Sequence, residues 1–565
     1  MNQERLAVAR GDQLADVVYI NGQILDIYNG VWVSQSLAVH QGIIVGLGDY
    51  QGKETIDLQG MYVVPGLIDA HVHIESSLLT PEEFSRLVLP RGTVAVVADP
   101  HEIANVYGIP GIEYILEANE HTDLDIFVML PSCVPATSVE SSGASILAED
   151  LRPLMQHPSV LGLGEMMNYP GVVYGDEEVH KKLELAREYG KMIDGHIEPQ
   201  DMKELNAYAV NGIAANHECT NLLQARMNLS AGLALMLREG TAARNLEALL
   251  PVVNAYNRSR CMFCTDDRHP DHIEEQGHID YAVRRAIELG MDPIHAIQMG
   301  SMNAAAFFGL HEYGAIAPGK RADFIVLEQV ETFQIHSVYK RGVKVAEQGM
   351  FCRQPEMMRA LPQNLPIGLQ CSTLEKQDLL LPVYERNVAI QLVPGEILTK
   401  KIIFKKEDVS RLKKIAVIER HHKTGQVGLG WVQGFAFTQA AIASTIAHDS
   451  HNLIVVGDND EDMLKAISCV KDMNGGLAVV SQGAVLAKLA LPVAGLLSDR
   501  PYLEVKAALA SLRTAVMSVG QQEEDDPFMT LAFLALPVIP EIRITDRGLF
   551  DVKLFDYISS NAELR

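Results

Sequence analysis

Residues 65 to 73 read Pro65-Gly66-Leu67-Ile68-Asp69-Ala70-His71-Val72-His73, an apolar run that ends in two histidines. Short apolar runs of this kind are typical of buried β-strands. Side chains two residues apart on a strand point to the same side, so His71 and His73 can reach one metal ion together. A single His-x-His pair also occurs on ordinary surfaces and in cores, so the prediction depends on what the rest of the chain supplies.

The segment from residue 66 to 312 alternates short apolar runs with helical stretches. Eight strands that alternate with helices over about 250 residues predict a (β/α)8, TIM-like barrel. In such barrels the reactive residues lie at the carboxyl ends of the strands. The expected strands are 66–72, 93–98, 126–130, 160–164, 192–196, 213–216, 231–237 and 260–265.

Regions with a different pattern of apolar residues flank the expected barrel. Residues 13–64 and 322–346 carry alternating apolar runs separated by glycine turns, so we expect 1–65 plus 313–362 to form one split β-sandwich around the barrel, 66–312. Pro362, Pro366 and Gly368 indicate a linker, followed by an α/β or α+β domain over 363–565. In that domain we expect strands at 383–393, 415–418, 453–456 and 476–480, and helices at 440–448 and 461–469.

The amino-acid composition argues against some classes of binding partner. The chain has 47 Lys and Arg against 72 Asp and Glu, a formal net charge of −25, which argues against a nucleic-acid partner. No secretory signal and no membrane-spanning apolar stretch is visible, and seven scattered cysteines suit a reducing compartment. We therefore expect a cytoplasmic protein with no membrane partner, which forms a homo-oligomer, either a dimer or a tetramer.

Metal-ligating residue types follow several of the expected strands. Any one of them could be a coincidence, and Asp266 could cap the next helix. Together, four imidazoles and two carboxylates suit Mn, Fe or Zn, and they suffice for two ions if one carboxylate bridges. The candidate metal ligands are His71, His73, Glu165, His196, His217 and Asp266.

Longer motifs carry a resemblance to a known family. Residues 65–73, the later His196, His217 and Asp266, and residues 318–324 (Pro-Gly-Lys-Arg-Ala-Asp-Phe) resemble the amidohydrolase superfamily. More narrowly, residues 71–77, 99–105 and 264–270 are similar to the bacterial adenine deaminase family, as are residues 419–422 and 447–452 near the C-terminus. The resemblance extends over nearly the whole chain.

The resemblance implies a function. The chain would hydrolyse adenine to hypoxanthine and ammonia, in purine salvage, with hydroxide that a binuclear divalent metal centre makes available. We expect Mn(II) ahead of Fe(II), with Zn(II) behind both. Glu165 would bridge the two ions, and Asp266 would carry the proton to the ring or to the leaving amine. Dihydroorotases and hydantoinases are known for a carboxylated lysine where this chain has Glu165, which counts against a cyclic amide as substrate.

Several roles stay open at this stage. Asp267 is expected to receive an N–H of the purine, or else to serve a turn or a cap. His101 and Glu102 are candidates for substrate binding, for an accessory metal or for a cap. The alternative functions are hydrolysis of another aminopurine or of a cyclic amide, and a catalytically silent metal-binding protein. Two polar clusters of unassigned role, expected to cover the barrel mouth or shape the purine pocket, comprise Glu419, His421, His422, His448, Asp449 and His451.

Overall fold

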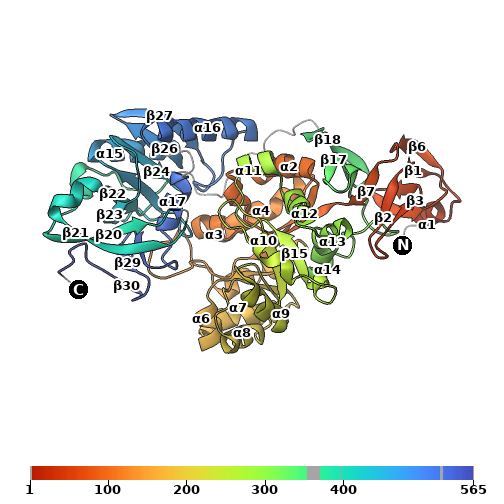
Figure 1. The fold of residues 1–565 in the computed structure, drawn as a ribbon, viewed down its shortest axis with the longest axis horizontal. Coiled ribbons are helices and arrows are strands. Elements are labelled where there is room, and N and C mark those ends of the chain that lie inside the picture. The colour runs from red at the N-terminus through yellow and green to blue at the C-terminus, as the bar shows by residue number, and fades with distance from the viewer. Residues whose placement is uncertain (1–2, 353–368, 395, 522–525, 564–565) are drawn as a thin grey trace.

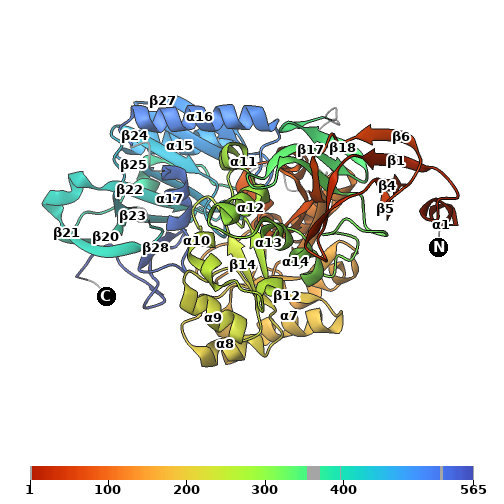
Figure 2. The ribbon, with the colours of Figure 1, turned by 45° about the vertical axis from the view of Figure 1, so that its right-hand side comes forward.

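The computed structural model describes residues 3–352, 369–394, 396–521 and 526–563. The predicted linker residues Pro362, Pro366 and Gly368 lie outside these ranges, as does the predicted boundary at 362/363. Figure 1 shows a central barrel with a β-sandwich at the N-terminal side and a C-terminal region at the other, and Figure 2 shows the same order after a 45° turn.

The predicted barrel is confirmed. Its parallel strands form two sheets, in the orders β12-β11-β10-β9-β8 and β13-β14-β15. Backbone hydrogen bonds cross both gaps between these sheets: Ala214 N donates to Ile193 O (2.9 Å), and Asp266 N donates to His71 O (2.9 Å). The strands are β8 (Leu67–Val72), β9 (Thr93–Ala98), β10 (Asp125–Leu130), β11 (Val160–Met166), β12 (Met192–Gly195), β13 (Ala215–Asn216), β14 (Ala234–Arg238) and β15 (Cys261–Cys264).

Helices fill the connections and cover the outside of the barrel (Figure 2). Side-chain caps begin several of them; in α7, for example, Asp176 accepts hydrogen bonds from the N–H groups of Glu178 and Val179. The helices are α2 (Pro81–Val88), α3 (His101–Tyr107), α4 (Ile109–Glu117), α5 (Ala148–Leu151), α6 (Tyr169–Tyr174), α7 (Glu177–Glu188), α8 (Met202–Ala209), α9 (Leu222–Ser230), α10 (Leu246–Leu249), α11 (Pro270–Gln276), α12 (Ile279–Glu288), α13 (Pro293–Met299) and α14 (Met302–Phe307).

Both flanking segments contribute to the sandwich, as expected. In its larger sheet, of order β19-β18-β17-β16-β7-β2-β3, β7 from before the barrel pairs with β16 from after it. The smaller sheet, of order β5-β4-β1-β6, packs against it through Tyr19, Val39 and Phe324. The strands are β1 (Ala15–Ile20), β2 (Gln23–Asp26), β3 (Val31–Ser34), β4 (Leu37–His40), β5 (Ile43–Leu47), β6 (Gly52–Asp57), β7 (Tyr62–Pro65), β16 (Phe324–Gln329), β17 (Gln334–Lys340), β18 (Val343–Glu347) and β19 (Met350–Phe351), and helix α1 (Gln3–Ala9) precedes them.

The C-terminal region is built on a mixed sheet of order β21-β20-β23-β22-β25-β24-β26-β27. Figure 1 shows α15 and α16 along the end of the sheet that carries β24, β26 and β27, and α17 on the barrel side. The elements are β20 (Arg386–Leu392), β21 (Thr399–Lys405), β22 (Lys413–Ile418), β23 (Val427–Gln433), β24 (Ala440–Ser444), β25 (Leu453–Gly457), α15 (Asp460–Asp472), β26 (Gly476–Ser481), β27 (Ala484–Ala490), α16 (Tyr502–Ser518), α17 (Pro527–Leu534) and a small sheet, β28 (Ile542–Thr545), β29 (Gly548–Asp551) and β30 (Asp556–Tyr557).

One predicted helix is wrong. Residues 440–448 were expected to be helical, yet Ala440–Ser444 form strand β24, which lies between β25 and β26. All five residues of this strand are buried. A strand covered on both faces has no alternating pattern, so its sequence cannot be distinguished from a short buried helix. The helix predicted at 461–469 is present as α15.

No helix in the described part of the chain is long and apolar enough to cross a membrane.

A buried charge cluster joins the sandwich to the start of barrel strand β10. Asp125, the first residue of β10, accepts hydrogen bonds from Lys340 of β17 and from Arg321 Nη2 (2.5 Å). Lys340 also lies 3.1 Å from Asp323 and donates to Val94 O of β9 (2.8 Å). Burial would raise the pKa of Asp125, but the charges of Lys340 and Arg321 hold it below its usual range.

We predict that Asp125→Asn lowers the free energy of unfolding by about 2–3 kcal/mol at pH 7, because two buried cations then share only Asp323. Since the native pKa of Asp125 is lowered, its contribution is fully present above the unfolded pKa of about 3.9 and is lost as the pH falls through the native value. The deficit of the variant should therefore shrink below about pH 4. Urea midpoints at pH 7, 5 and 3.5 measure it.

The matched control is Asp12→Asn, which breaks the exposed pair with Arg10. Exposed pairs contribute about 0–1 kcal/mol, so this variant should unfold close to the wild type. Equal midpoints for Asp125→Asn and Asp12→Asn at pH 7 would contradict the prediction.

Candidate metal centre

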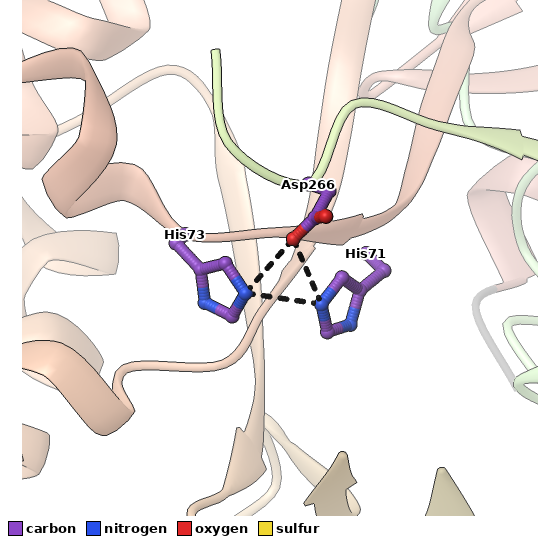
Figure 3. Close-up of side chains that lie close together, drawn as sticks. All are labelled: His71, His73 and Asp266. Carbon is purple, nitrogen blue, oxygen red and sulfur yellow. Dashed lines mark hydrogen bonds and ion pairs between the residues drawn. The ribbon is translucent and has the colours of Figure 1, made fainter. Parts of the chain in front are cut away.

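The closed barrel brings the candidate ligands of β8 and β15 together (Figure 3). His71 Nε2 lies 3.2 Å from His73 Nε2, and Asp266 Oδ1 lies 3.7 Å from the first of these atoms and 3.1 Å from the second. All three side chains are buried. Two imidazole nitrogens and a carboxylate oxygen at this separation can coordinate one ion.

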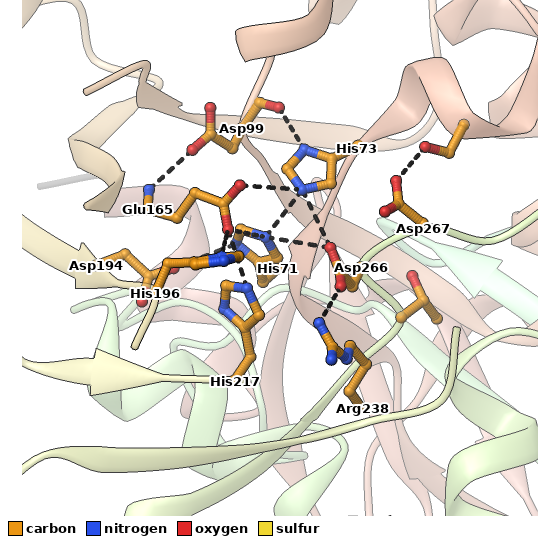
Figure 4. Close-up of polar contacts among 12 residues, drawn as sticks. His71, His73, Asp99, Glu165, Asp194, His196, His217, Arg238, Asp266 and Asp267 are labelled. Atoms are coloured by element: carbon orange, nitrogen blue, oxygen red, sulfur yellow. Dashed lines mark hydrogen bonds and ion pairs between the residues drawn. The ribbon is translucent and has the colours of Figure 1, made fainter. Parts of the chain in front are cut away.

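Glu165, near the end of β11, lies between this group and the histidines that follow β12 and β13 (Figure 4). Its Oε2 is 2.8 Å from His196 Nδ1, 2.9 Å from His217 Nε2 and 3.7 Å from His71 Nε2. Its Oε1 is 3.6 Å from His73 Nε2. The two oxygens of one carboxylate thus face different histidines, which is the arrangement a bridging ligand needs.

The chemistry of these donors fits a divalent metal. Neither ring nitrogen of buried His217 has hydrogen-bond geometry to any described residue, although its Nε2 lies beside Glu165. Buried polar atoms without a partner are costly, so such an atom indicates a group that satisfies it. Candidate ligand sets within 4.8 Å include His71 with His73 and Asp266, and His71 with Glu165 and His217.

Both carboxylates of the centre are held in the ionised form. Burial would raise the pKa of Glu165, but the surrounding imidazoles, His196 first among them, keep it well below its usual range. Burial would likewise raise the pKa of Asp266, and the guanidinium of Arg238, whose Nη1 is 2.5 Å from Asp266 Oδ2, keeps it well below its usual range. Metal ligands must be deprotonated, so this environment prepares both groups for binding.

Asp266 has a backbone conformation that is rare for a residue other than glycine, with φ of 59°. It is held there by hydrogen bonds on both sides, from its own N–H to His71 O (2.9 Å) and from His73 N–H to its carbonyl (3.1 Å). Strained residues of this kind persist where surrounding structure fixes them, and they concentrate at functional sites.

Three supporting residues were not predicted. Asp194 Oδ2 is 3.2 Å from His71 Nδ1, and the carbonyl of Asp99 is 2.9 Å from His73 Nδ1. The side chain of Asp99 also accepts a hydrogen bond from Glu165 N, at a point where any Cβ on Gly164 would collide with it. With Arg238, these residues orient the ligands, as outer partners of metal sites do. All three residues lie at or near the ends of barrel strands, and this position could have identified them in the sequence.

Above the centre lies a cavity of about 490 Å³ between the barrel mouth and the C-terminal region. Asp266, Asp267 and Glu102 line it, and Ser76 donates a hydrogen bond to Asp267. His101 does not belong to its wall; its Nδ1 lies 3.5 Å from Glu165 Oε1, beside the metal centre. The C-terminal region contributes His448, His451, Phe528 and Phe533, among others.

The two polar clusters of the C-terminal region have different places. His448 and His451 line the cavity, and Asp449 is buried beside them. Glu419 accepts hydrogen bonds from the N–H groups of its own loop, residues 421, 422 and 424. His422 Nε2 lies 2.9 Å from Ser142 O of the barrel, and His421 Nε2 lies 2.8 Å from Ser450 O. Glu419, His421 and His422 thus hold a loop and its contact with the barrel, whereas His448 and His451 belong to the cavity wall.

Comparison with known proteins agrees with this architecture. Residues 62–345 match the model of the amidohydrolase family, and residues 394–556 match that of the adenine deaminase C-terminal domain. An "Adenine deaminase 2" of Carboxydothermus hydrogenoformans is 46% identical over 98% of this chain and 99% of its own. An "Adenine deaminase" of Desulfatibacillum aliphaticivorans is 44% identical over 99% of both chains, and one of Halalkalibacterium halodurans is 42% identical over 98% and 97%.

The chain is thus a metal-dependent hydrolase of the amidohydrolase family. Within this family it belongs to the adenine deaminases, which it matches over 98–99% of its length.

We predict that Glu165→Gln lowers the affinity for metal, because the amide removes the charge that faces the histidines. Loss of a residue that only supports a ligand lowers metal affinity roughly 10- to 100-fold, and the effect of Glu165→Gln should be larger. Asp194→Asn, which weakens only the support of His71, should fall within that 10- to 100-fold range. Metal content after dialysis at a fixed Mn(II) concentration, measured by elemental analysis, checks both.

Glu198→Gln is the matched control, since Glu198 is an exposed glutamate two residues after His196 whose partners are Thr220 and Gln224. It should bind metal as the wild type does. If Glu165→Gln retained as much metal as Glu198→Gln, Glu165 would not be a metal ligand.

Proposed function

We propose that this chain hydrolyses adenine to hypoxanthine and ammonia at a binuclear centre of divalent metal, with Mn(II) preferred over Fe(II) and Zn(II). The proposed ligands are His71, His73, Glu165, His196, His217 and Asp266. The observation that carries the proposal is the position of Glu165, whose two oxygens face histidines from both gaps of the barrel. Relatives of near-identical length that are named adenine deaminases support the substrate.

Hydrolysis at C6 of adenine needs a nucleophile stronger than water at neutral pH. A divalent metal held there would supply it by lowering the pKa of water toward about 7. Asp266 would accept a proton from the attacking water and return it to the ring or to the departing amine nitrogen. Its Oδ1 faces the histidines and its Oδ2 is held by Arg238, so the carboxylate stays in one orientation while the proton moves.

The cavity wall suits a flat, neutral heterocycle with polar edges. Asp267 offers a carboxylate that would accept an N–H of the purine, fixed by the hydroxyl of Ser76. Phe528, Phe533 and Leu496 supply apolar surface for the ring. Pockets that combine apolar walls with a few placed polar groups are typical of small-molecule sites. The alternative, another aminopurine or a cyclic amide, predicts a different preferred substrate at the same centre.

The dimer or tetramer, the cytoplasmic location and the role in purine salvage are parts of the proposal that follow from the family and the composition.

We predict that protein loaded with Mn(II) releases ammonia from adenine and forms an equal amount of hypoxanthine, which chromatography quantifies. Removal of metal by a chelator should abolish turnover, and adding back Mn(II), Fe(II) or Zn(II) ranks the ions. Asp266→Asn should lower kcat by about 100-fold or more, because proton transfer by a placed side chain contributes about 10²–10⁴-fold.

Glu198→Gln again serves as the control and should keep the activity of the wild type. Protein that binds two ions and leaves adenine unchanged would overturn the proposed substrate, and a screen of other aminopurines and cyclic amides would follow.

A further inference from the structure

A second polar cluster joins the C-terminal region to the cavity wall. Glu102, at the start of α3, is 3% exposed and lies between two histidines 346 and 349 residues further along the chain. Its Oε1 is 2.6 Å from His448 Nδ1, and its Oε2 accepts a hydrogen bond from His451 Nε2. Burial would raise the pKa of Glu102, but His451, His448 and His101 hold it well below its usual range, so this carboxylate acts as an acceptor.

The partners of His451 fix its tautomer. Its Nδ1 accepts a hydrogen bond from Ala447 N–H (3.2 Å), so its proton is on Nε2, which donates to Glu102. The pKa of His451 is lowered by burial, which agrees with a neutral ring. Although Glu102, His448 and His451 are close enough to hold an ion, a metal would need the lone pair of the nitrogen that carries the proton. The cluster is therefore a hydrogen-bonded support.

His448 is the member of the cluster that can act on a ligand. Its Nδ1 faces Glu102, and its ring stacks on Phe533 with centroids 4.9 Å apart and planes at 27°. Its Nε2 makes no hydrogen bond to a described residue, and the side chain lines the cavity with Asp266 and Asp267. Burial would lower the pKa of His448, but the charge of Glu102 raises it to about 9, so Nε2 carries a proton at neutral pH.

We propose that His448 of the C-terminal region donates a hydrogen bond from Nε2 to an acceptor nitrogen of the purine ring, and that Glu102 positions it for that contact. The inference rests on the proposed function for the substrate. Asp267 and His448 then form a complementary pair, one accepting from the purine edge and one donating to it. A ring nitrogen replaced by C–H would leave the imidazolium donor without a partner, which is how buried donors discriminate between similar ligands.

Substitution of His448 by Asn or by Gln tests the roles of its two ring nitrogens separately. In His448→Asn the amide can replace Nδ1 opposite Glu102 but leaves nothing at Nε2, whereas in His448→Gln the amide reaches toward the position of Nε2. We expect His448→Asn to lower kcat/KM for adenine about 10- to 100-fold, the effect of one hydrogen bond from a charged donor, and His448→Gln to recover part of it. His422→Gln, at the same interface but outside the cavity wall, is the control.

The decisive measurement uses 1-, 3- and 7-deazaadenine as competitive inhibitors, each of which lacks one ring nitrogen. In the wild type and in His422→Gln, one analogue should bind about 10- to 100-fold more weakly than the other two. In His448→Asn that difference should disappear, with metal content and Tm as in the wild type. A purely structural role would leave the order of the analogues unchanged, and that outcome would overturn the inference.

Further outcomes distinguish a failure of the inference about His448 from a failure of the proposed function. If the wild type does not deaminate adenine, the proposed function fails; if it does and His448→Asn is fully active, only the inference about His448 fails. A third equivalent of bound metal that is lost in His451→Asn would show that the cluster is a metal site, and would also overturn the inference.

Discussion

The contact of Glu165 with histidines from three strands is the interaction on which the barrel mouth depends. The parallel sheet is interrupted twice, between β12 and β13 and between β15 and β8. His196 and His217 stand at the first gap, and His71, His73 and Asp266 at the second. Side chains thus converge at the two places where one sheet ends and the other begins, and Glu165 faces both of them. The arrangement of the candidate metal ligands therefore depends on the closure of the barrel.

The barrel could be predicted, and six candidate ligands could be proposed, because buried parallel strands are continuous apolar runs, so a polar residue at the end of one stands out. Asp194 and Arg238 also stand near strand ends, but their roles depend on neighbours that only the closed barrel defines. The same absence of pattern misled the prediction for Ala440–Ser444, where complete burial removes the alternation that distinguishes a strand.

The polar clusters of the C-terminal region could be recognised in the sequence. Which cluster lines the cavity and which holds a loop could not. Glu102 and His448 are 346 residues apart, so no local spacing indicates that they meet. The contacts that bring them together are ordinary ones along the interface: Ser450 donates to Glu140, and Asn452 donates to Ser141 O at 2.7 Å. Tertiary structure therefore decides which histidines face the cavity and which hold a loop.

The two flanking regions use opposite ends of the barrel. The sandwich is joined by the Asp125 cluster to the amino-terminal ends of β9 and β10, whereas the C-terminal region meets the segments that follow the carboxyl ends of the same strands. In barrel enzymes the carboxyl face carries the chemistry and the other face carries stability. The C-terminal region therefore forms part of the cavity wall beside the candidate metal centre, and the sandwich is part of the scaffold.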